Sequence, residues 1–488
     1  MFDATQTETA KPQDTAMDRI ETDICIIGAG SGGLSVAAGA AQMGARVVLI
    51  EGHKMGGDCL NYGCVPSKAL IAAGKQSHAM TTGAPYGVTP VMPEVSYAAA
   101  KDHVTRAIET IAPHDSQERF EGFGVTVLRA MARFISATEV QAGDTVVTAR
   151  RFVVATGSSP FVPPIPGLDT VPHHTNETIF DLREKPEHLI VIGGGPIGIE
   201  MAQAHIRLGS KVTVVEGAKA LGRDDPEAAG LVLAKLRAEG VEIAENTQAE
   251  RVSGADGAIT VHTPDGGSIT GSHLLVAVGR KVNVDGLDLE QAGVRYDRKG
   301  VKVDASLRAS NRRVYAIGDA AGGLQFTHLA GYHAGVIIRS MLFGLPAKAR
   351  TDHIPRATYT DPELAQVGLT ETEAKKAHGS KLEVVRAELS ANDRAVAEGK
   401  TDGFVKVMVV KGRPVGATIV GAQAGEQISL WAMAIANNLK MTALSNTVMP
   451  YPTLSEASKR AAGAYFTPRL FDNPTVERVV GVVQRFLP

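Results

Sequence analysis

The amino-acid sequence predicts an α/β protein, and three observations support this fold class. The composition is rich in Gly and Ala, with only 5% aromatic residues, which favours close packing of helices on a sheet. An apolar strand, a glycine-rich turn, an Ala-rich helix and a second apolar strand follow one another in the same order twice. From residue 351 onward, alternating strands in "GFVKVMVV" and "GATIVGAQ" precede the helical "EQISLWAMAIANN", a pattern typical of an α+β region with an antiparallel sheet.

Length and charge restrict the possibilities further. At 488 residues the chain exceeds what one hydrophobic core usually serves, so we expect two to four domains. The 50 Lys and Arg residues nearly balance 52 Asp and Glu residues, and no long run of one sign occurs, which argues against nucleic acid and anionic membrane as partners. Residues 1–19 are polar, lack the features of a signal peptide and are expected to form a flexible tail. No apolar run is long enough for a spanning helix, so we expect a cytoplasmic protein.

The repeated plan carries a glycine pattern, and in both copies an acidic residue follows at the same distance. The segments are "DICIIGAGSGGLSVAAGAAQMGARVVLIE" and "HLIVIGGGPIGIEMAQAHIRLGSKVTVVE". The acids are Glu51 and Glu216, each 23 residues after the first glycine of its motif, since 51 − 28 = 216 − 193 = 23. The six motif glycines are Gly28, Gly30 and Gly33 in the first copy and Gly193, Gly195 and Gly198 in the second.

This arrangement predicts two dinucleotide-binding units. In G-x-G-x-x-G the first glycine permits a tight turn, the second lets the backbone approach a pyrophosphate, and the third allows close helix–strand packing. The acid then accepts hydrogen bonds from ribose hydroxyls. A carboxylate at Glu216 favours the free 2′-hydroxyl of NADH, although Lys219 and Arg223 lie close by in sequence and leave NADPH possible. The proline-rich "FVPPIPG" is expected to link the two nucleotide domains.

The stretch "GGDCLNYGCVPSK" places Cys59 and Cys64 five residues apart in a chain with one other cysteine. A metal site would need further Cys or His residues at ligand spacing, and none lies nearby in sequence. A structural disulfide has little purpose in a large cytoplasmic protein. A redox pair needs a stabilised thiolate, which Lys68 and an apparent helix start would favour, so we interpret the two cysteines as a redox pair. Cys25, in the apolar "DICIIG", is expected to be an ordinary buried residue.

With both glycine motifs and this cysteine stretch, the chain resembles the two-dinucleotide flavoproteins of the pyridine nucleotide-disulfide oxidoreductase family, closest to its mercuric reductase-like and dihydrolipoamide dehydrogenase branch. The resemblance implies FAD at the first motif, a nicotinamide at the second and a C-terminal interface domain that forms a homodimer. It also implies roles for single residues. Cys59 would meet the substrate, Cys64 would lie beside the flavin, and Lys68 and Glu200 would form an ion pair near it. The remaining implied contacts are Gly157, Asp319 and His328 with FAD, in addition to the first motif and Glu51, and Gly279 with NAD, in addition to the second motif and Glu216.

The sequence also departs from the family pattern. In "MPYPTLSEASKR" Glu456 is present, but Tyr451 stands where lipoamide dehydrogenases and glutathione reductases carry a His that serves as acid and base. A tyrosine with a pKa near 10 is a poor base at pH 7. Tyrosine at this position resembles mercuric reductase, but the C-terminal cysteine pair of that enzyme is missing here. Asp58 replaces the expected Thr and is expected to raise the pKa of Cys59 by like-charge repulsion.

The sequence therefore predicts an FAD-dependent NAD(P)H oxidoreductase that passes electrons to the Cys59/Cys64 pair and on to a disulfide or a thiol-reactive metal ion, with no resident metal. One alternative is a dihydrolipoamide dehydrogenase that uses NAD; another is a flavin-loaded structural subunit without turnover. The C-terminal "ERVVGVVQRFL" has the apolar spacing of a docking helix. The expected domains are an FAD-binding domain (20–160 and 282–350), an NAD(P)-binding domain (161–281) and a dimerisation domain (351–488).

Overall fold

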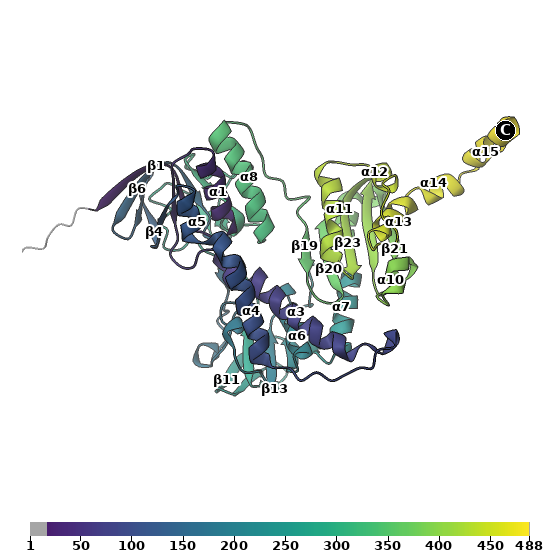
Figure 1. Cartoon of the computed structure of the whole chain (residues 1–488), viewed down its shortest axis with the longest axis horizontal. Helices are drawn as coiled ribbons and strands as arrows, with labels where there is room; N and C mark the ends of the chain where they lie inside the picture. The colour runs from purple at the N-terminus through teal and green to yellow at the C-terminus, as the bar shows by residue number, and fades with distance from the viewer. Residues whose placement is uncertain (1–16, 488) are drawn as a thin grey trace, which may run out of the picture. The chain divides into compact units, whose positions relative to one another are not determined.

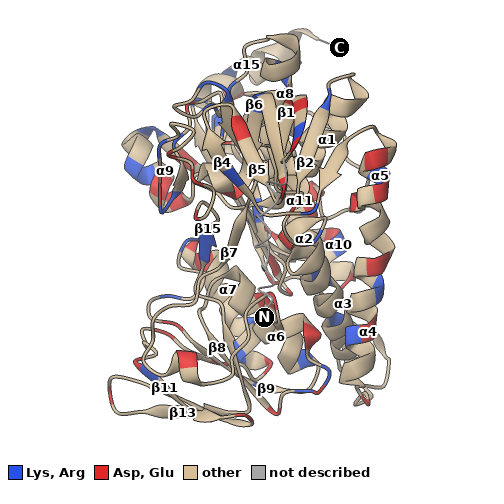
Figure 2. Ribbon diagram, turned by 90° about the vertical axis from the view of Figure 1, so that its left-hand side faces the viewer, with Lys and Arg blue, Asp and Glu red and all other residues tan. Residues whose placement is uncertain are grey.

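The computed structural model describes residues 17–487 and divides them into two compact units. The first unit contains the chain up to Met55, Asp115–Gly157 and Val282–Ala347, and the second contains the rest. Most of the predicted tail, 1–16, lies outside the described residues, and Asp18 already begins the first strand. The predicted domain boundaries stay a prediction. Figure 1 shows the order of the elements along the chain, and Figure 2 shows basic and acidic residues interspersed along the ribbon.

One mostly parallel sheet forms the centre of the first unit. Its order is β3-β2-β1-β6-β5-β4, and β18 also pairs with β6. The pairs among β1, β2, β3, β6 and β18 are parallel, so these strands end at one edge of the sheet. Helices α1 and α8 pack against each other (Figure 1), and the side chain of Ile338 closely approaches Gly39. The elements are β1 (Asp18–Ile27), α1 (Ser31–Gln42), β2 (Val47–Ile50), α5 (Gln117–Gly122), β3 (Thr126–Leu128), β4 (Ala132–Ser136), β5 (Glu139–Ala142), β6 (Thr145–Val154), β16 (Tyr296–Asp297), β17 (Gly300–Val301), β18 (Val314–Ala316) and α8 (Thr327–Phe343).

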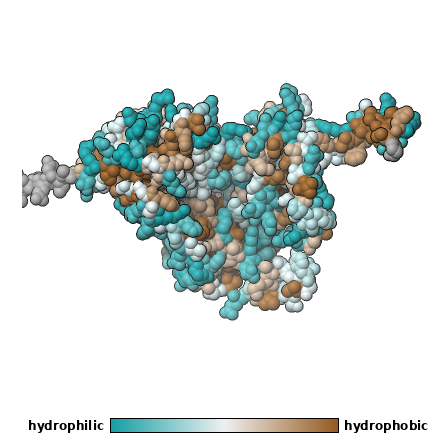
Figure 3. All heavy atoms as spheres, turned by 45° about the horizontal axis from the view of Figure 1, so that its top comes forward, coloured by the Kyte–Doolittle hydropathy of each residue, from teal (hydrophilic) through white to brown (hydrophobic). Residues whose placement is uncertain are grey.

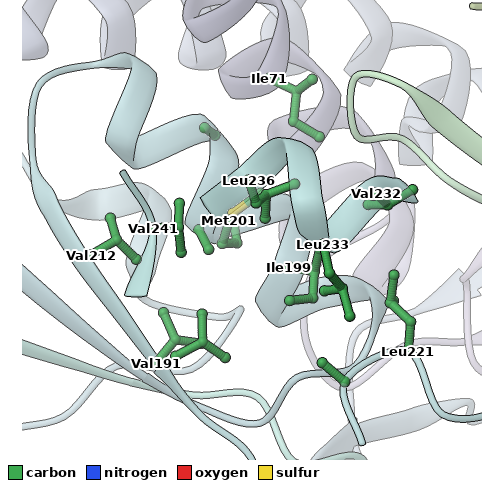
Figure 4. Packing of buried hydrophobic residues seen from close by; sticks show 14 of the residues in the cluster. Ile71, Val191, Ile199, Met201, Val212, Leu221, Val232, Leu233, Leu236 and Val241 are labelled. Atoms are coloured by element: carbon green, nitrogen blue, oxygen red, sulfur yellow. The ribbon is translucent and has the colours of Figure 1, made fainter. Parts of the chain in front are cut away.

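The second unit begins with a helical segment and continues into a second parallel sheet of order β10-β9-β8-β14. Apolar residues of α3, α6, α7, β8 and β9 share one core (Figure 4), in which the side chains of Val191, Ile199 and Leu236 are almost completely buried. The elements are α2 (Gly57–Asn61), α3 (Cys64–Thr81), α4 (Tyr97–Ile111), β7 (Ser158–Pro160), β8 (His188–Ile192), α6 (Pro196–Arg207), β9 (Lys211–Val215), α7 (Pro226–Ala238), β10 (Glu242–Ala244), the antiparallel β11 (Arg251–Ala255), β12 (Ala258–His262) and β13 (Ser268–Gly271), and β14 (His273–Val276).

The C-terminal part of the second unit is the predicted α+β region. Its five strands are all antiparallel in the order β19-β20-β23-β22-β21. Helix α11 packs on this sheet, and its buried Trp431 donates a hydrogen bond to Ser458 at 3.0 Å. The elements are β19 (Arg356–Thr358), β20 (Glu363–Gly368), α9 (Glu371–His378), β21 (Leu382–Glu388), α10 (Asp393–Ala397), β22 (Phe404–Val410), β23 (Arg413–Gly421), α11 (Ala424–Ala436), α12 (Met441–Ser445), α13 (Glu456–Ala464), α14 (Thr467–Phe471) and α15 (Pro474–Phe486).

The predicted fold class is confirmed: two parallel-sheet βαβ units precede an antiparallel α+β region. Cys25 lies in β1 and is completely buried, as expected, and burial raises the pKa of its thiol. Among residues 17–487, no helix is both long and apolar enough to cross a membrane.

Candidate active site

The first glycine motif forms a tight turn between β1 and α1. Gly28 has a φ of +103°, and a Cβ there would lie 2.5 Å from the carbonyl oxygen of Ala155. A Cβ on Gly33 would lie 1.9 Å from the carbonyl oxygen of Gly28, so α1 approaches the strand end as closely as glycine alone allows. Gly30 is the N-cap of α1, and the helix N-terminus therefore begins directly after the turn.

The second motif repeats this geometry between β8 and α6. Gly193 has a φ of +111°, and a Cβ on Gly198 would lie 2.0 Å from the carbonyl oxygen of Gly193. Gly195 is the N-cap of α6, and a Cβ on it would meet no atom of the chain within 4 Å. Both turns thus have the close strand–helix approach and the helix N-terminus that a pyrophosphate requires.

The two acids occupy equivalent positions and hold their own glycine turns. Glu51 accepts hydrogen bonds from the backbone N–H groups of Ala29 at 2.6 Å and His53 at 2.7 Å. Glu216 accepts the same pair of bonds from Gly194 at 2.6 Å and Ala218 at 2.8 Å. Each carboxylate oxygen keeps a second lone pair, which is available for a ribose hydroxyl. The acids therefore shape the turn in addition to the ribose contact that the sequence predicts.

The other residues predicted to contact FAD lie in the first unit at the carboxyl edge of its sheet. Gly157 follows β6, and Asp319 follows β18. His328 lies in the first turn of α8, where its ring stacks on Phe326 at 5.2 Å between ring centroids. Sequence reasoning missed His333, which lies five residues further along α8 and whose Nδ1 accepts a hydrogen bond from the N–H of Gly318 at 3.2 Å. Its sequence signal was the second histidine of "FTHLAGYHAG".

The cysteines lie at the junction of two helices in the second unit. Cys59 is in α2 and is partly buried, whereas Cys64 is exposed and is the first residue of α3. Cys64 therefore lies at the N-terminus of an 18-residue helix, a position that favours negative charge. Between the helices, a Cβ on Gly63 would lie 2.8 Å from the Asp58 carboxylate, so the chain turns tightly between the two cysteines.

Lys68 and Glu200 form the predicted ion pair, with Nζ and Oε2 2.8 Å apart. The Glu200 side chain is buried on α6, and its other oxygen accepts a hydrogen bond from the backbone N–H of Tyr359 at 2.8 Å. The Lys68 Nζ also lies 4.4 Å from the centroid of the Tyr359 ring. Burial, followed by the charge of Glu200, raises the pKa of Tyr359. The ion pair joins α3, one turn beyond Cys64, to the helix of the second glycine motif.

Asp58 is tied to residues far away in sequence. Its carboxylate accepts a hydrogen bond from Asn176 at 3.0 Å and lies 3.1 Å from the Arg280 guanidinium. Asn176 also donates to the carbonyl of Tyr62, so one amide binds the chain both before and after Cys59. Arg280 is therefore a charge partner of Asp58, and the expected effect of Asp58 on Cys59 stays a prediction. Neither partner had been singled out from sequence, although Arg280 directly follows Gly279.

Tyr451 and Glu456 lie in the C-terminal region. The Tyr451 side chain is exposed, and its hydroxyl donates a hydrogen bond to Asp393 at 2.9 Å. This hydrogen bond, together with the charge of Asp393, raises the pKa of Tyr451 above its usual value. Glu456 begins α13, and its Oε2 is buried with no hydrogen-bond partner among residues 17–487. The structure thus pairs Tyr451 with Asp393 through their side chains.

Comparisons with known proteins agree with these features. Residues 22–334 match the pyridine nucleotide-disulphide oxidoreductase family, and residues 354–462 match its dimerisation domain. The mercuric reductase of Acidithiobacillus ferrooxidans is 35% identical over 465 residues, which cover 92% of this chain and 83% of that protein. The dihydrolipoyl dehydrogenase of Geobacillus stearothermophilus is 32% identical over 455 residues, which cover 91% and 96%. The Cu(II) complex of the HOCl-induced flavoprotein disulfide reductase RclA from Escherichia coli matches with a TM-score of 0.80 at 29% identity, covering 89% of this chain and 98% of that chain.

The chain therefore belongs to the pyridine nucleotide-disulphide oxidoreductase family. It is a flavoprotein disulfide oxidoreductase of the group that contains mercuric reductase, dihydrolipoyl dehydrogenase and RclA. The family binds FAD and NAD(P)H, and the dimerisation domain implies a homodimer.

Proposed function

We propose that this protein is an NADH-dependent, mercuric reductase-like oxidoreductase in which Cys59 and Cys64 accept electrons and pass them to a disulfide or a thiol-reactive metal ion. The observation that carries this proposal is the arrangement around the cysteines. Cys64 begins a long helix, and one turn later Lys68 is bound to the buried Glu200. We place this activity in the cytoplasm, where a disulfide is more often catalytic than structural.

The two glycine turns fit the two cofactors of the family. The first turn with Glu51, Gly157, Asp319 and His328 would hold FAD, and the second turn with Glu216 and Gly279 would hold NADH. The room above Gly195 and the helix N-termini that follow both turns support this assignment. Bound FAD supplies the hydride and electron-transfer chemistry between the nicotinamide and the thiols.

With a disulfide substrate, the two cysteines act in sequence. The Cys59 thiolate attacks one sulfur of the substrate, forms a mixed disulfide and releases the first thiolate. The Cys64 thiolate then attacks the Cys59 sulfur, which releases the second thiolate and leaves a Cys59–Cys64 disulfide. The substrate gains two electrons, the cysteine pair loses two, and each released thiolate takes a proton from water. Overall, a disulfide, NADH and one proton give two thiols and NAD⁺.

A soft metal ion would need no proton relay. Two thiolates bind such an ion directly, and reduction of a divalent ion by NADH gives the neutral metal, NAD⁺ and one proton. The raised pKa of Tyr451 supports this substrate class, because a phenol that donates to Asp393 is poorly suited to taking a proton from a thiol near pH 7. The named relatives agree with both classes of substrate: one is called a mercuric reductase, and another a disulfide reductase in complex with Cu(II).

A dihydrolipoamide dehydrogenase is the second candidate, because a dihydrolipoyl dehydrogenase matches over nearly the same length. In that case another group, such as Glu456 acting through water, would replace the missing histidine. The buried Oε2 of Glu456 is the observation that favours this candidate. Turnover of dihydrolipoamide with NAD⁺ at a rate unchanged by Tyr451→Phe would support it over our proposal.

The test is an anaerobic NADH titration of the FAD-loaded protein, followed by addition of lipoamide, glutathione disulfide or Hg(II). We expect Hg(II) or one of the disulfides to reoxidise the reduced protein selectively. The Cys59→Ser variant should still be reduced by NADH but should lose reoxidation by the same acceptor. Equal reoxidation of wild type and variant would contradict the proposed role of Cys59.

A further inference from the structure

The C-terminal arm, defined here as α14, α15 and Leu487, has an apolar face that is exposed in this chain. Helix α15 has no buried residue along its whole length. Figure 1 shows the arm extending from the C-terminal region, and Figure 3 shows hydrophobic residues gathered along it. Its exposed apolar residues are Val479, Val480, Val482, Val483, Phe486 and Leu487, and the side chain of Phe486 is 81% exposed.

Most of the apolar residues of α15 lie on one side of the helix. Positions 476, 479, 480, 483 and 486 follow the spacing of a single helical face, Val482 lies beside it, and Leu487 follows the last helical residue. Asn473 caps the helix by accepting a hydrogen bond from the N–H of Thr475 at 3.0 Å, and Pro474 occupies the first helical position. Five of the 13 residues are valines, which have low helix propensity, and an isolated helix of this length is marginal in water. Helix α15 therefore needs a packing partner.

Helix α14, with which the arm begins, contacts the dimerisation domain. Arg469 of α14 forms an ion pair with Glu383 of β21. The same guanidinium lies 3.7 Å from the centroid of the Tyr465 ring and donates to the Tyr465 carbonyl. These contacts hold α14 against the dimerisation domain, whereas the apolar face of α15, the next helix, is exposed.

We propose that the C-terminal arm packs on a second copy of this chain and extends the homodimer interface. The argument is continuity: the match to the dimerisation domain ends at residue 462, five residues before α14 begins. An arm that leaves one protomer beside a two-fold interface can reach the other, and symmetry lets both arms bind in the same way. The inference rests on the homodimer that this domain implies and is independent of the proposed redox substrate.

The charges of the arm favour a protein partner over a membrane. The opposite face of α15 carries Glu477, Arg478, Gln484 and Arg485, a small group that contains both signs of charge. Helices that lie on anionic membranes usually have a polar face rich in Lys and Arg. Valine and phenylalanine side chains on one face match the apolar core of a subunit interface.

The test compares two double variants of the FAD-loaded protein. V479D with V483D places two charges on the apolar face, and the control, G481D with Q484D, adds the same charge to the polar face. A Cβ on Gly481 meets no atom within 4 Å, so the control is sterically permitted. A chain ending at Asp472 removes α15 altogether. Sedimentation velocity gives the monomer–dimer dissociation constant of each protein.

We expect the apolar-face variant and the shortened chain to dissociate at least 10-fold more readily than wild type, with the control within twofold. Unchanged dissociation constants, with a lower melting temperature of the shortened chain, would show that the arm packs on its own protomer and would overturn the proposal. Binding of wild type, but not of the apolar-face variant, to phosphatidylcholine–phosphatidylglycerol vesicles with unchanged dimerisation would identify a membrane contact instead. A wild type that is monomeric at micromolar concentration would overturn both the arm contact and the homodimer, while the NADH titration tests the redox function separately.

Discussion

Replacement of Glu216 by Gln should change the preference between the two nicotinamide dinucleotides. The Glu216 carboxylate accepts backbone hydrogen bonds from Gly194 and Ala218, one with each oxygen. Glutamine offers only one acceptor oxygen, so Glu216→Gln leaves one of these N–H groups without its acceptor. That cost falls equally on NAD⁺ and NADP⁺ binding, because both use the same turn. The ratio of the two dissociation constants therefore isolates the effect of the charge.

The size of the change follows from two effects. A hydrogen bond from the ribose 2′-hydroxyl to a charged acceptor contributes about 1.5–3 kcal/mol, and one to a neutral acceptor about 0.5–1.5 kcal/mol, so NAD⁺ loses about 1 kcal/mol or more. A 2′-phosphate about 6 Å from the carboxylate is repelled by up to about 3 kcal/mol per charge at an effective dielectric constant near 20, and solvent screening reduces this to about 1 kcal/mol. Together the preference should move by about 2 kcal/mol, or about 30-fold, towards NADP⁺.

Isothermal titration calorimetry of the FAD-loaded protein with NAD⁺ and NADP⁺ measures this ratio without turnover. Glu51→Gln is the matched control, because Glu51 makes the equivalent bonds in the first turn. We expect the control to weaken FAD retention and to leave the NAD⁺/NADP⁺ ratio unchanged. If Glu216→Gln weakens both dinucleotides by the same factor, the reasoning that assigns NADH through this carboxylate is wrong.

Three further predictions concern the second unit. Gly198→Ala should weaken NAD⁺ binding at least 10-fold, because the new methyl group would lie 2.0 Å from a backbone carbonyl, whereas Gly230→Ala on α7 meets no atom and should bind normally by calorimetry. Glu200→Ala should lower the free energy of unfolding by about 1–3 kcal/mol in denaturant titrations, since the Tyr359 N–H loses its acceptor. Glu200→Gln should lower it less, because the amide oxygen of glutamine still accepts this hydrogen bond. Equal losses for the two variants would contradict the hydrogen bond between Tyr359 and Glu200. Burial lowers the pKa of Lys101 from 10.5 to about 7. Between these two pH values the Lys101 amine is protonated in the unfolded chain but mostly neutral in the folded chain, so the free energy of unfolding rises with pH. Relative to Lys101→Met, the wild type should gain about 2 kcal/mol from pH 7 to pH 9 in thermal melts, and parallel pH profiles would refute the burial of this amine.

Local sequence patterns were sufficient to predict the turns and strands whose conformation depends on residues close by in sequence. The two glycine motifs predicted tight turns, because positive φ angles and sub-contact distances at Gly28 and Gly193 admit no side chain. The antiparallel C-terminal sheet followed from alternating strands with short connections. The offset of 23 residues assigned Glu216 to the second motif, whereas its hydrogen bond from the Gly194 N–H came from the structure.

Contacts that join distant segments could not be predicted in this way. Asp58 was recognised as unusual, but its partners Asn176 and Arg280 lie on other elements of the fold. Both contacts depend on how these distant segments fold together. The sequence shows that Tyr451 stands where related enzymes carry a histidine base. Its hydrogen bond to Asp393, which raises the pKa of Tyr451, is seen only in the structure. A lone sequence also does not reveal substrate identity, because both proposed substrate classes use the same pair of thiolates.

The central claim is that Cys59 and Cys64 form a reversible redox pair driven by NADH. The most direct measurement is anaerobic alkylation with iodoacetamide, before and after one equivalent of NADH, with mass spectrometry of the peptide that contains both cysteines. The proposal predicts no label on this peptide in the oxidised protein and two labels after NADH, while the buried Cys25 stays unlabelled in the folded protein. Labelling of Cys59 and Cys64 to the same extent with and without NADH would contradict the claim.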